Sequence, residues 1–326
     1  MSNKHKYLYS LLAVLPLSIT SCAHNIHHDI SEYILTSPYK DNYRILQLTD
    51  IHMGDKDNQD EHYRFLDSVI KDANADMIIV TGDVFTFASQ STAIRFFNFM
   101  ESQKTPWSVV WGNHDEQVYF SIDWMTGYLN DLTNKGGYCL FKDIQDDDIT
   151  GNSNFAINLM DGSTIKEQLI LMDSNRYCYG EYIGYDYFKQ NQIDWYSSLV
   201  DHTTSKAGGV VKSLMFYHIP LPEINDAFEQ GTDLDGEKRE NCCPPKYNSG
   251  FFDVIVERQS TNGMFFGHDH INNFNVVYKD VLFSYGLKSD NRVYYDDDMM
   301  GGQVITIKEG QLPTVERIVK TYEEAK

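Results

Sequence analysis

Short apolar runs that each end in a cluster of polar residues constrain the fold of this chain more than any other feature of its sequence. The first run starts at Tyr43 and ends in "TDIH", the second ends in "TGD", and the third is "WSVVWGNHDE". Between them, residues 61–73 and 91–103 have apolar residues at helical spacing. Strand, helix, strand, helix, strand in this order predicts an α/β core with right-handed crossovers.

The second half of the chain has more β-strand character. Its apolar runs predict strands within residues 167–175, 210–220, 263–270, 273–286 and 301–319. Helices are predicted within residues 187–204 and 248–259. Three prolines, two adjacent cysteines and many charges in residues 222–250 predict an irregular loop, of the kind that often forms a lid or a wall beside a site.

Five polar clusters follow five of these runs and carry the residue types of a metal site. Because the carboxyl ends of strands in an open α/β sheet face one crevice, clusters far apart in sequence can meet there. The candidate residues are Asp50, His52, Asp83, Asn113, His114, His218, His268 and His270. Each cluster alone has a simpler explanation: Asp50 and Asp83 as helix caps, Asn113 as a turn residue, or His218 as a core histidine.

Without His114, the set contains two carboxylates, four imidazoles and one amide oxygen. These donors suit Zn²⁺, Mn²⁺ or iron, and none of them is a thiolate. Seven donors exceed what a single ion with open positions needs. A pair of metal ions bridged by one carboxylate and a water would use them all.

The motifs resemble, in content and order, those of the calcineurin-like metallophosphoesterases: D-x-H, G-D, G-N-H-D/E, a lone histidine and G-H-x-H. The stretches "WSVVWGNHDEQ", "FYHIPLPE", "NSGFF" and "FFGHDH" are similar to the purple-acid-phosphatase-like branch of that family. The resemblance covers residues 43–310. It implies a four-layer α/β/β/α sandwich of two mixed β-sheets flanked by helices.

The resemblance also implies a role for each candidate residue. One metal ion would be held by Asp50, His52, Asp83 and His270, and the other by Asp83, Asn113, His218 and His268. Asp83 is then the bridge, and a hydroxide shared by the two ions attacks the phosphate. His114 would act as the catalytic residue that stabilises the phosphoryl oxygens and protonates the leaving oxygen.

Two positions depart from true purple acid phosphatases. His52 stands where those enzymes have glycine, and Thr86 stands where they have a tyrosine ligand. The absence of this tyrosine predicts a protein without a charge-transfer colour. Thr86 also cannot supply the carboxylate that orients the catalytic histidine in protein-phosphatase relatives, so the sequence assigns no partner to His114.

The function implied is hydrolysis of phosphomonoesters or small phosphodiesters. The alternatives are a cyclic-nucleotide or glycerophosphodiester phosphodiesterase, and a non-catalytic surface lipoprotein that retains the fold. The sequence does not separate them, because the choice of leaving group depends on the 222–250 loop. With a formal net charge of −20, the chain would repel nucleic acid, which is therefore not an expected partner. The resemblance implies a small phosphate ester as the partner; the oligomeric state stays open, with a monomer as the expectation.

The first residues predict export. Lys4 and Lys6 precede a short apolar run, and "ITSC" resembles the lipobox of bacterial lipoproteins, which predicts a signal peptide over residues 1–21 and a lipid on Cys22. Residues 22–42 are expected to form a tether to the periplasmic or outer-membrane side, and residues 311–326 a C-terminal strand and tail. His5, His62 and His202 are expected at the surface, the pairing of the cysteines stays open, and Tyr217, Asn248 and Tyr285 are weaker candidates for substrate contact.

Overall fold

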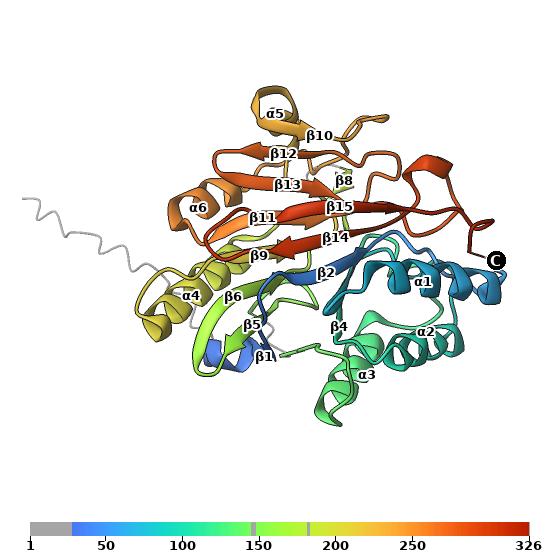
Figure 1. The fold of residues 1–326 in the computed structure, drawn as a ribbon, viewed down its shortest axis with the longest axis horizontal. Helices are drawn as coiled ribbons and strands as arrows, with labels where there is room; N and C mark the ends of the chain where they lie inside the picture. The colour runs from blue at the N-terminus through green and yellow to red at the C-terminus, as the bar shows by residue number, and fades with distance from the viewer. Residues whose placement is uncertain (1–27, 145–147, 181–182, 326) are drawn as a thin grey trace, which may run out of the picture.

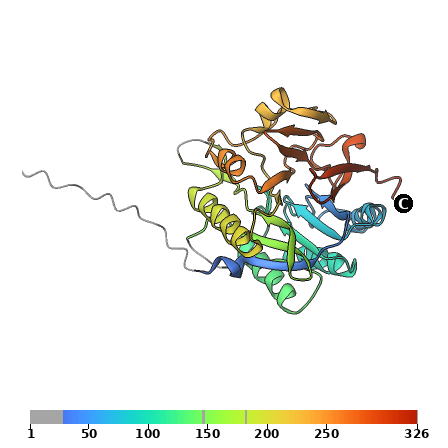
Figure 2. The same cartoon turned by 60° about the vertical axis from the view of Figure 1, so that its left-hand side comes forward.

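Two β-sheets packed against each other form the centre of the molecule (Figure 1). The computed structural model describes residues 28–144, 148–180 and 183–325. Figure 2 shows helices on opposite sides of the paired sheets, with α1 (Gln59–Ala73) on one side and α4 (Gln190–Ala207) on the other. The predicted architecture of two mixed sheets between helical layers is therefore confirmed.

The first sheet has five strands in the order β15-β14-β2-β3-β4. Three of them are parallel and lie at one side of the sheet: β2 (Tyr43–Leu48), β3 (Met77–Thr81) and β4 (Trp107–Val110). The helices α1 and α2 (Gln90–Ser102) connect them, as the alternating pattern predicted. The antiparallel strands β14 (Gly301–Ile307) and β15 (Thr314–Val319) complete the sheet, and α3 (Ile122–Asn134), which was not predicted, follows β4.

The second sheet has eight strands in the order β1-β5-β6-β9-β11-β13-β12-β10. Their bounds are β1 (Ile34–Pro38), β5 (Phe155–Asp161), β6 (Thr164–Leu171), β9 (Ser213–Phe216), β10 (Thr232–Asp235), β11 (Thr261–Phe266), β12 (Asn275–Tyr278) and β13 (Val281–Tyr285). The neighbouring strands β6, β9, β11 and β13 run parallel, so several carboxyl ends again meet at one edge. The outer face of this sheet carries α4 and α6 (Phe251–Arg258).

Side chains that alternate along each strand divide the core into two parts. Leu169 and Leu171 belong to the apolar cluster shared with the five-stranded sheet, whereas Ile170 and Met172 belong to the cluster under α4 and α6. Successive side chains of a strand point to opposite faces, so a sheet that is covered on both faces needs apolar residues at every position. This explains why the strands read as continuous apolar runs.

Two predictions about irregular segments were wrong. Within residues 222–250 the chain forms α5 (Ile224–Gln230) and β10, because β10 pairs with β12 and extends the sheet. The tether predicted over residues 22–42 is ordered at its end: η1 (Ile30–Tyr33) precedes β1, which pairs with β5 over its whole length. Tyr33 is buried against Trp195, so this segment belongs to the folded domain.

The N-terminal predictions mostly lie outside the described residues. The signal peptide over residues 1–21 and Cys22 belong to that part of the chain. Among the described helices, none is long and apolar enough to cross a membrane. Where the structure describes them, Cys139, Cys178, Cys242 and Cys243 form no disulfide with one another.

Candidate metal centre

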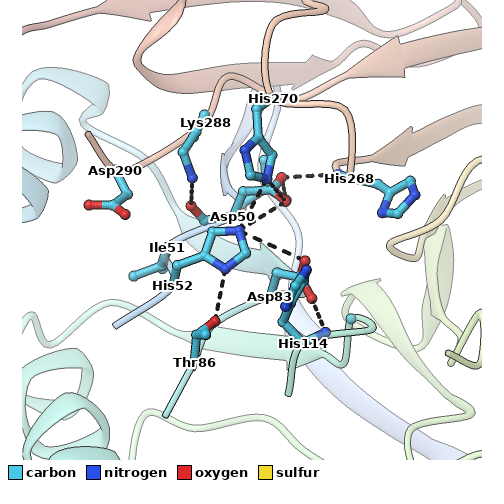
Figure 3. A network of polar contacts seen from close by, with 12 residues as sticks. Asp50, Ile51, His52, Asp83, Thr86, His114, His268, His270, Lys288 and Asp290 are labelled. Carbon is cyan, nitrogen blue, oxygen red and sulfur yellow. Dashed lines mark hydrogen bonds and ion pairs between the residues drawn. The ribbon is translucent and has the colours of Figure 1, made fainter. Parts of the chain in front are cut away.

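The polar clusters lie just beyond the carboxyl ends of strands from both sheets (Figure 3). Asp50 and His52 follow β2, Asp83 follows β3, and Asn113 and His114 follow β4. His218 follows β9, and His268 and His270 follow β11. The backbone nitrogen of His268 donates to Asp50 Oδ2 at 3.0 Å, which joins the two sheets directly at the site.

Unusual backbone geometry turns the ligand residues out of their strands. Asp50, His52, Asp83 and His268 all have left-handed φ angles, of 54°, 47°, 49° and 83°. Such conformations cost free energy in non-glycine residues and occur preferentially at functional sites. Gly82 also has a positive φ of 85°, and a Cβ there would lie only 2.6 Å from the ring of His218. Glycine thus allows β3 to approach the histidine that follows β9.

The candidate ligands form two adjacent groups. Asp50, His52 and His270 make one group, and Asp83, His218 and His268 make the other; within each, the potential ligand atoms all lie within 4.8 Å of one another. Asp83 Oδ2 lies 3.1 Å from His218 Nε2 and 3.9 Å from His52 Nε2. The carboxylate of Asp83 therefore lies between the groups, where a bridging ligand would be.

Several buried atoms of the candidate ligands lack hydrogen-bond partners among the described residues. They are Asp50 Oδ1, Asn113 Oδ1, His218 Nε2 and His268 Nε2. Buried polar atoms in proteins are almost always paired, because leaving one unpaired costs about 1–3 kcal/mol. All four face one region and are atoms that bind cations well, so the donor set fits metal ions.

The other ring nitrogen of three histidines is held in place. His218 Nδ1 lies 2.8 Å from the backbone oxygen of Thr81, and His270 Nδ1 lies 3.1 Å from that of Tyr294. His52 Nδ1 lies 2.9 Å from Thr86 Oγ1 (Figure 3). Outer partners of this kind direct Nε2 toward a metal and are typical of metal-binding histidines.

Burial and neighbouring charges place two of the ligands, His268 and Asp83, in the protonation states that metal binding requires. Burial lowers the pKa of His268 to about 3, which keeps this imidazole neutral. Burial by itself would raise the pKa of Asp83, but the adjacent His218 and His52 hold it below its ordinary value, so Asp83 stays ionised. For His218, burial by itself would lower the pKa, but the carboxylates of Asp83 and Asp50 raise it to about 10. A buried lysine, Lys288, donates from Nζ to the backbone oxygen of Asp50 at 2.9 Å and places a positive charge beside the carboxylates.

His114 differs from the other histidines because it is partly exposed and belongs to neither group. Its backbone nitrogen donates to Asp83 Oδ1 at 2.7 Å, and its ring lies edge-on to that of His52 with 5.1 Å between centroids. The Nδ1 atom lies 2.8 Å from the amide oxygen Oε1 of Gln117. Gln117 is the partner that the sequence left unassigned. A glutamine three residues after the histidine, in the same turn, was the available signal.

Three tyrosines that the sequence did not single out surround the site. Tyr177 accepts a hydrogen bond from Asn113 Nδ2 at 3.0 Å. Tyr185 packs edge-on against His268, and Tyr294 stacks on His270, each with 4.3 Å between centroids. Only the high tyrosine content hinted at this, because these residues lie outside the motifs.

Other predictions about individual residues need correction. Tyr217 and Tyr285 are fully buried in the core under the eight-stranded sheet and cannot contact a substrate. Asn248 is exposed and donates from Nδ2 to Glu223 Oε1, and its contact with substrate stays a prediction. His62 was expected at the surface but is 2% exposed. Its Nε2 lies 3.1 Å from the backbone oxygen of Ser289, which explains how a histidine on α1 is accommodated inside the molecule.

Comparison with known proteins agrees with this geometry. The model of a family described as calcineurin-like phosphoesterase matches residues 43–272. The chain is 29% identical over 272 residues to the "Probable inactive purple acid phosphatase 14" of Arabidopsis thaliana, covering 71% of this chain and 66% of that protein. It is 27% identical over 265 residues to the "Phosphatase DCR2" of Saccharomyces cerevisiae, covering 71% of this chain and 44% of that protein. The chain thus spans less than two thirds of the length of these relatives.

A solved structure of a dimetal phosphatase from Danio rerio has the same fold. The match has a TM-score of 0.52 and 13% sequence identity, and covers 85% of this chain and 99% of the other. The two groups of side chains in this chain fit a dinuclear metal centre.

Proposed function

Because this chain belongs to the calcineurin-like phosphoesterase family, we propose that it hydrolyses phosphomonoesters or small phosphodiesters at a dinuclear metal centre. The observation that carries this proposal is the set of orphaned donor atoms on Asp50, Asn113, His218 and His268. These atoms belong to loops that follow strands of both sheets, are buried, and lack a hydrogen-bond partner among the described residues.

We assign Asp50, His52 and His270 to one metal ion and Asn113, His218 and His268 to the other, with Asp83 contacting both. When bound, the two ions would lower the pKa of a shared water and neutralise phosphate oxygens. They would also offset locally the negative field of a protein with a formal charge of −20. Hydrolysis of an anionic substrate is therefore compatible with an acidic protein.

His114 is the residue that we propose as the general acid. Its Nδ1 is engaged by Gln117, which leaves Nε2 to donate a proton to the leaving oxygen. Its backbone nitrogen is fixed on Asp83, so the imidazole is tied to the carboxylate between the two ligand groups. This arrangement positions a proton donor beside the metal centre without making it a ligand.

The main competing proposal is a non-catalytic protein that retains the fold. Three relatives are named probable inactive purple acid phosphatases, and another is named a phosphatase. In this chain every donor position is filled, and His114 has an orienting partner in Gln117. Both observations favour catalysis. Within enzymes, a cyclic-nucleotide or glycerophosphodiester phosphodiesterase remains the second candidate.

An assay of the purified protein separates these possibilities. The substrates are p-nitrophenyl phosphate and bis(p-nitrophenyl) phosphate, each with added Mn²⁺ or Zn²⁺, and metal content is measured by elemental analysis. We expect Asp83→Ala to lose bound metal and turnover. His114→Ala should keep two metal ions and lose turnover by about 100-fold or more, the contribution of general acid catalysis.

The competing outcomes are distinct. The non-catalytic alternative is favoured if the wild-type protein hydrolyses neither ester above background and Asp83→Ala gives the same background rate. Faster hydrolysis of the diester would favour the phosphodiesterase. Elemental analysis of protein purified without added metal identifies the native ions.

We further propose that the chain is exported and anchored by a lipid on Cys22 to the periplasmic or outer-membrane side of a bacterial membrane. The support is the order of residue types in residues 4–22: two lysines come first, an apolar run follows, and small residues precede Cys22. Cys22→Ala should move the protein from the membrane fraction to the soluble fraction and abolish incorporation of labelled fatty acid. Unchanged fractionation would contradict the anchor.

A further inference from the structure

A cavity of about 580 Å³ opens beside the metal centre. Its walls come from residues 54–57, Thr86 and Phe87, Tyr119, and residues 292–293, and His52 lines the part nearest the metal ligands. His52 and Thr86 are the hydrogen-bonded pair seen in Figure 3. A substrate whose phosphate lies at the metal centre can therefore extend its remaining part past His52 into this cavity.

Large apolar side chains are exposed at this cavity. Phe87, Tyr119 and Val293 are 60%, 67% and 66% exposed, and each comes from a different segment of the chain. Single exposed apolar residues are ordinary, but three that line one cavity next to a candidate catalytic centre indicate a binding surface.

The backbone at two of these residues is strained. Phe87 has a φ angle of 53° and Val293 one of 67°, and in the described ranges they are the two apolar residues with left-handed backbone. This conformation is a genuine outlier for a β-branched or bulky side chain. The nitrogen of Phe87 donates to the backbone oxygen of Gln117 at 2.7 Å, which helps to hold the conformation. Strain that presents apolar side chains to solvent beside a site points to a functional role.

The guanidinium and the carboxylates of the cavity lining are already paired. The guanidinium of Arg292 contacts the carboxylates of Asp57 and Asp290, and its Nη2 also lies 2.8 Å from His62 Nδ1. Asp55 Oδ1 accepts hydrogen bonds from Ser89 and Thr92. Lys56 is the other cation of the lining and is exposed. The interior thus offers apolar surface rather than a free charge for a second phosphate.

We propose that this cavity binds the leaving group of the phosphate ester and selects planar, uncharged aromatic groups, with Phe87 and Tyr119 determining specificity. The inference rests on the proposed phosphoesterase function and adds a substrate class to it. Gln117 links the cavity to catalysis, because its backbone oxygen holds Phe87 while its side chain orients His114. Gln117 thus contacts both a residue of the cavity wall and the proposed proton donor.

The test compares phenyl phosphate with 2-naphthyl phosphate on the metal-loaded full-length protein. The two leaving groups have nearly equal acidity but differ by one fused ring, so the ratio of kcat/KM values reports burial of that ring. We expect wild type to prefer the naphthyl ester about tenfold. Phe87→Ala and Tyr119→Ala should reduce this preference to less than about twofold, and Phe87→Leu should reduce it in part, because it keeps bulk without a flat ring.

Two control variants separate this effect from general damage. Tyr138→Ala removes a tyrosine that is 41% exposed and does not line the cavity, and Lys56→Ala removes the unpaired cation of the lining. Both should keep the tenfold preference. A loss of the preference in Lys56→Ala, with none in Phe87→Ala, would overturn the inference in favour of charge recognition.

A second readout does not depend on turnover. Titration of the metal-loaded protein with 2-naphthylmethylphosphonate, which has no scissile ester and is fluorescent, gives a Kd directly. We expect Phe87→Ala to weaken it about tenfold. Suppose both esters are hydrolysed, but wild type and Phe87→Ala have the same Kd for the phosphonate and the same ratio of kcat/KM values for the two esters. This result would refute the aromatic cavity and leave the proposed function standing. Absent turnover with the tenfold difference in Kd would refute the proposed function alone, and absent turnover with no difference in Kd would refute both.

Discussion

Replacing Gly267 with alanine should disrupt the metal centre although glycine contributes no ligand. Gly267 lies between β11 and His268, and a Cβ at this position would lie 1.9 Å from Thr49 Oγ1 and 2.4 Å from Asp50 Oδ2. Thr49 Oγ1 lies within hydrogen-bond distance of two acceptors, Asp50 Oδ2 at 2.8 Å and the backbone oxygen of Thr81 at 3.0 Å. The added methyl group therefore falls on a hydrogen bond that orients a ligand carboxylate.

The size of the effect follows from these distances. Asp50 Oδ2 must move by about 1 Å, and Thr49 Oγ1 by more, before both reach ordinary van der Waals contact with the new Cβ. A displacement of about 1 Å in a catalytic constellation can cost about 100-fold in rate, and overpacking a buried site costs about 1–3 kcal/mol of stability. We expect Gly267→Ala to lose at least that factor in kcat/KM and to bind less than two metal ions per chain.

The assay combines turnover of p-nitrophenyl phosphate, elemental analysis and thermal unfolding. Gly127→Ala is the matched control, because a Cβ there meets nothing within 4 Å and the residue lies in α3. Its stability should rise by about 0.5–1 kcal/mol, with turnover and metal content unchanged. If Gly267→Ala keeps two metal ions and wild-type turnover, the loops after β2 and β11 are not held by close packing and the reasoning is wrong.

Three further predictions concern residues around the site and in the core. Gln117→Ala should lower kcat about tenfold by releasing His114 while metal content stays at wild type, and Gln117→Glu should restore the rate; equal kcat in all three proteins would contradict the orienting role. Burial lowers the pKa of His62 from 6.5 to about 4, so between these pH values the unfolded state binds more protons at His62 than the folded state does. Wild type should therefore lose stability relative to His62→Gln as pH falls from 6.5 to 4. The free energies of unfolding from urea titrations would contradict this if both proteins changed equally with pH. Burial raises the pKa of Glu167 from 4.5 to about 8, so the sign reverses: wild type should lose stability relative to Glu167→Gln as pH rises from 4.5 to 8, and thermal unfolding at intermediate pH values checks it.

Much of the fold was predictable because its strands and helices leave local patterns. Residues 61–73 and 91–103 showed helical spacing and form α1 and α2 within a residue or two of these bounds. By contrast, β1 and β10 were missed, since each is a short strand at an edge of the eight-stranded sheet and depends on a partner far along the chain. Such edge pairings leave little trace in local sequence.

The residue types at the candidate site could also be read from the sequence, whereas their partners could not. Thr86 could be recognised as a departure from related enzymes, but its bond to His52 Nδ1 emerged only from the structure. In the same way Tyr294 reaches His270, and Lys288 reaches the backbone of Asp50. These contacts join segments that are far apart in the sequence, and the local periodicity of side chains does not reveal which distant segments meet.

By itself, the sequence determined which side chains stand at the ends of the strands and in what order, because the motif after each strand depends only on a few neighbouring residues. Tertiary structure alone decided how they are grouped: the packing of two sheets brings His268 to Asp50 across 218 residues and places Asp83 between the two ligand groups. It also decided that Phe87, Tyr119 and Val293 line one cavity. The physical reason is that strand formation is governed by local burial and periodicity, whereas convergence is governed by the packing of surfaces that are remote along the chain.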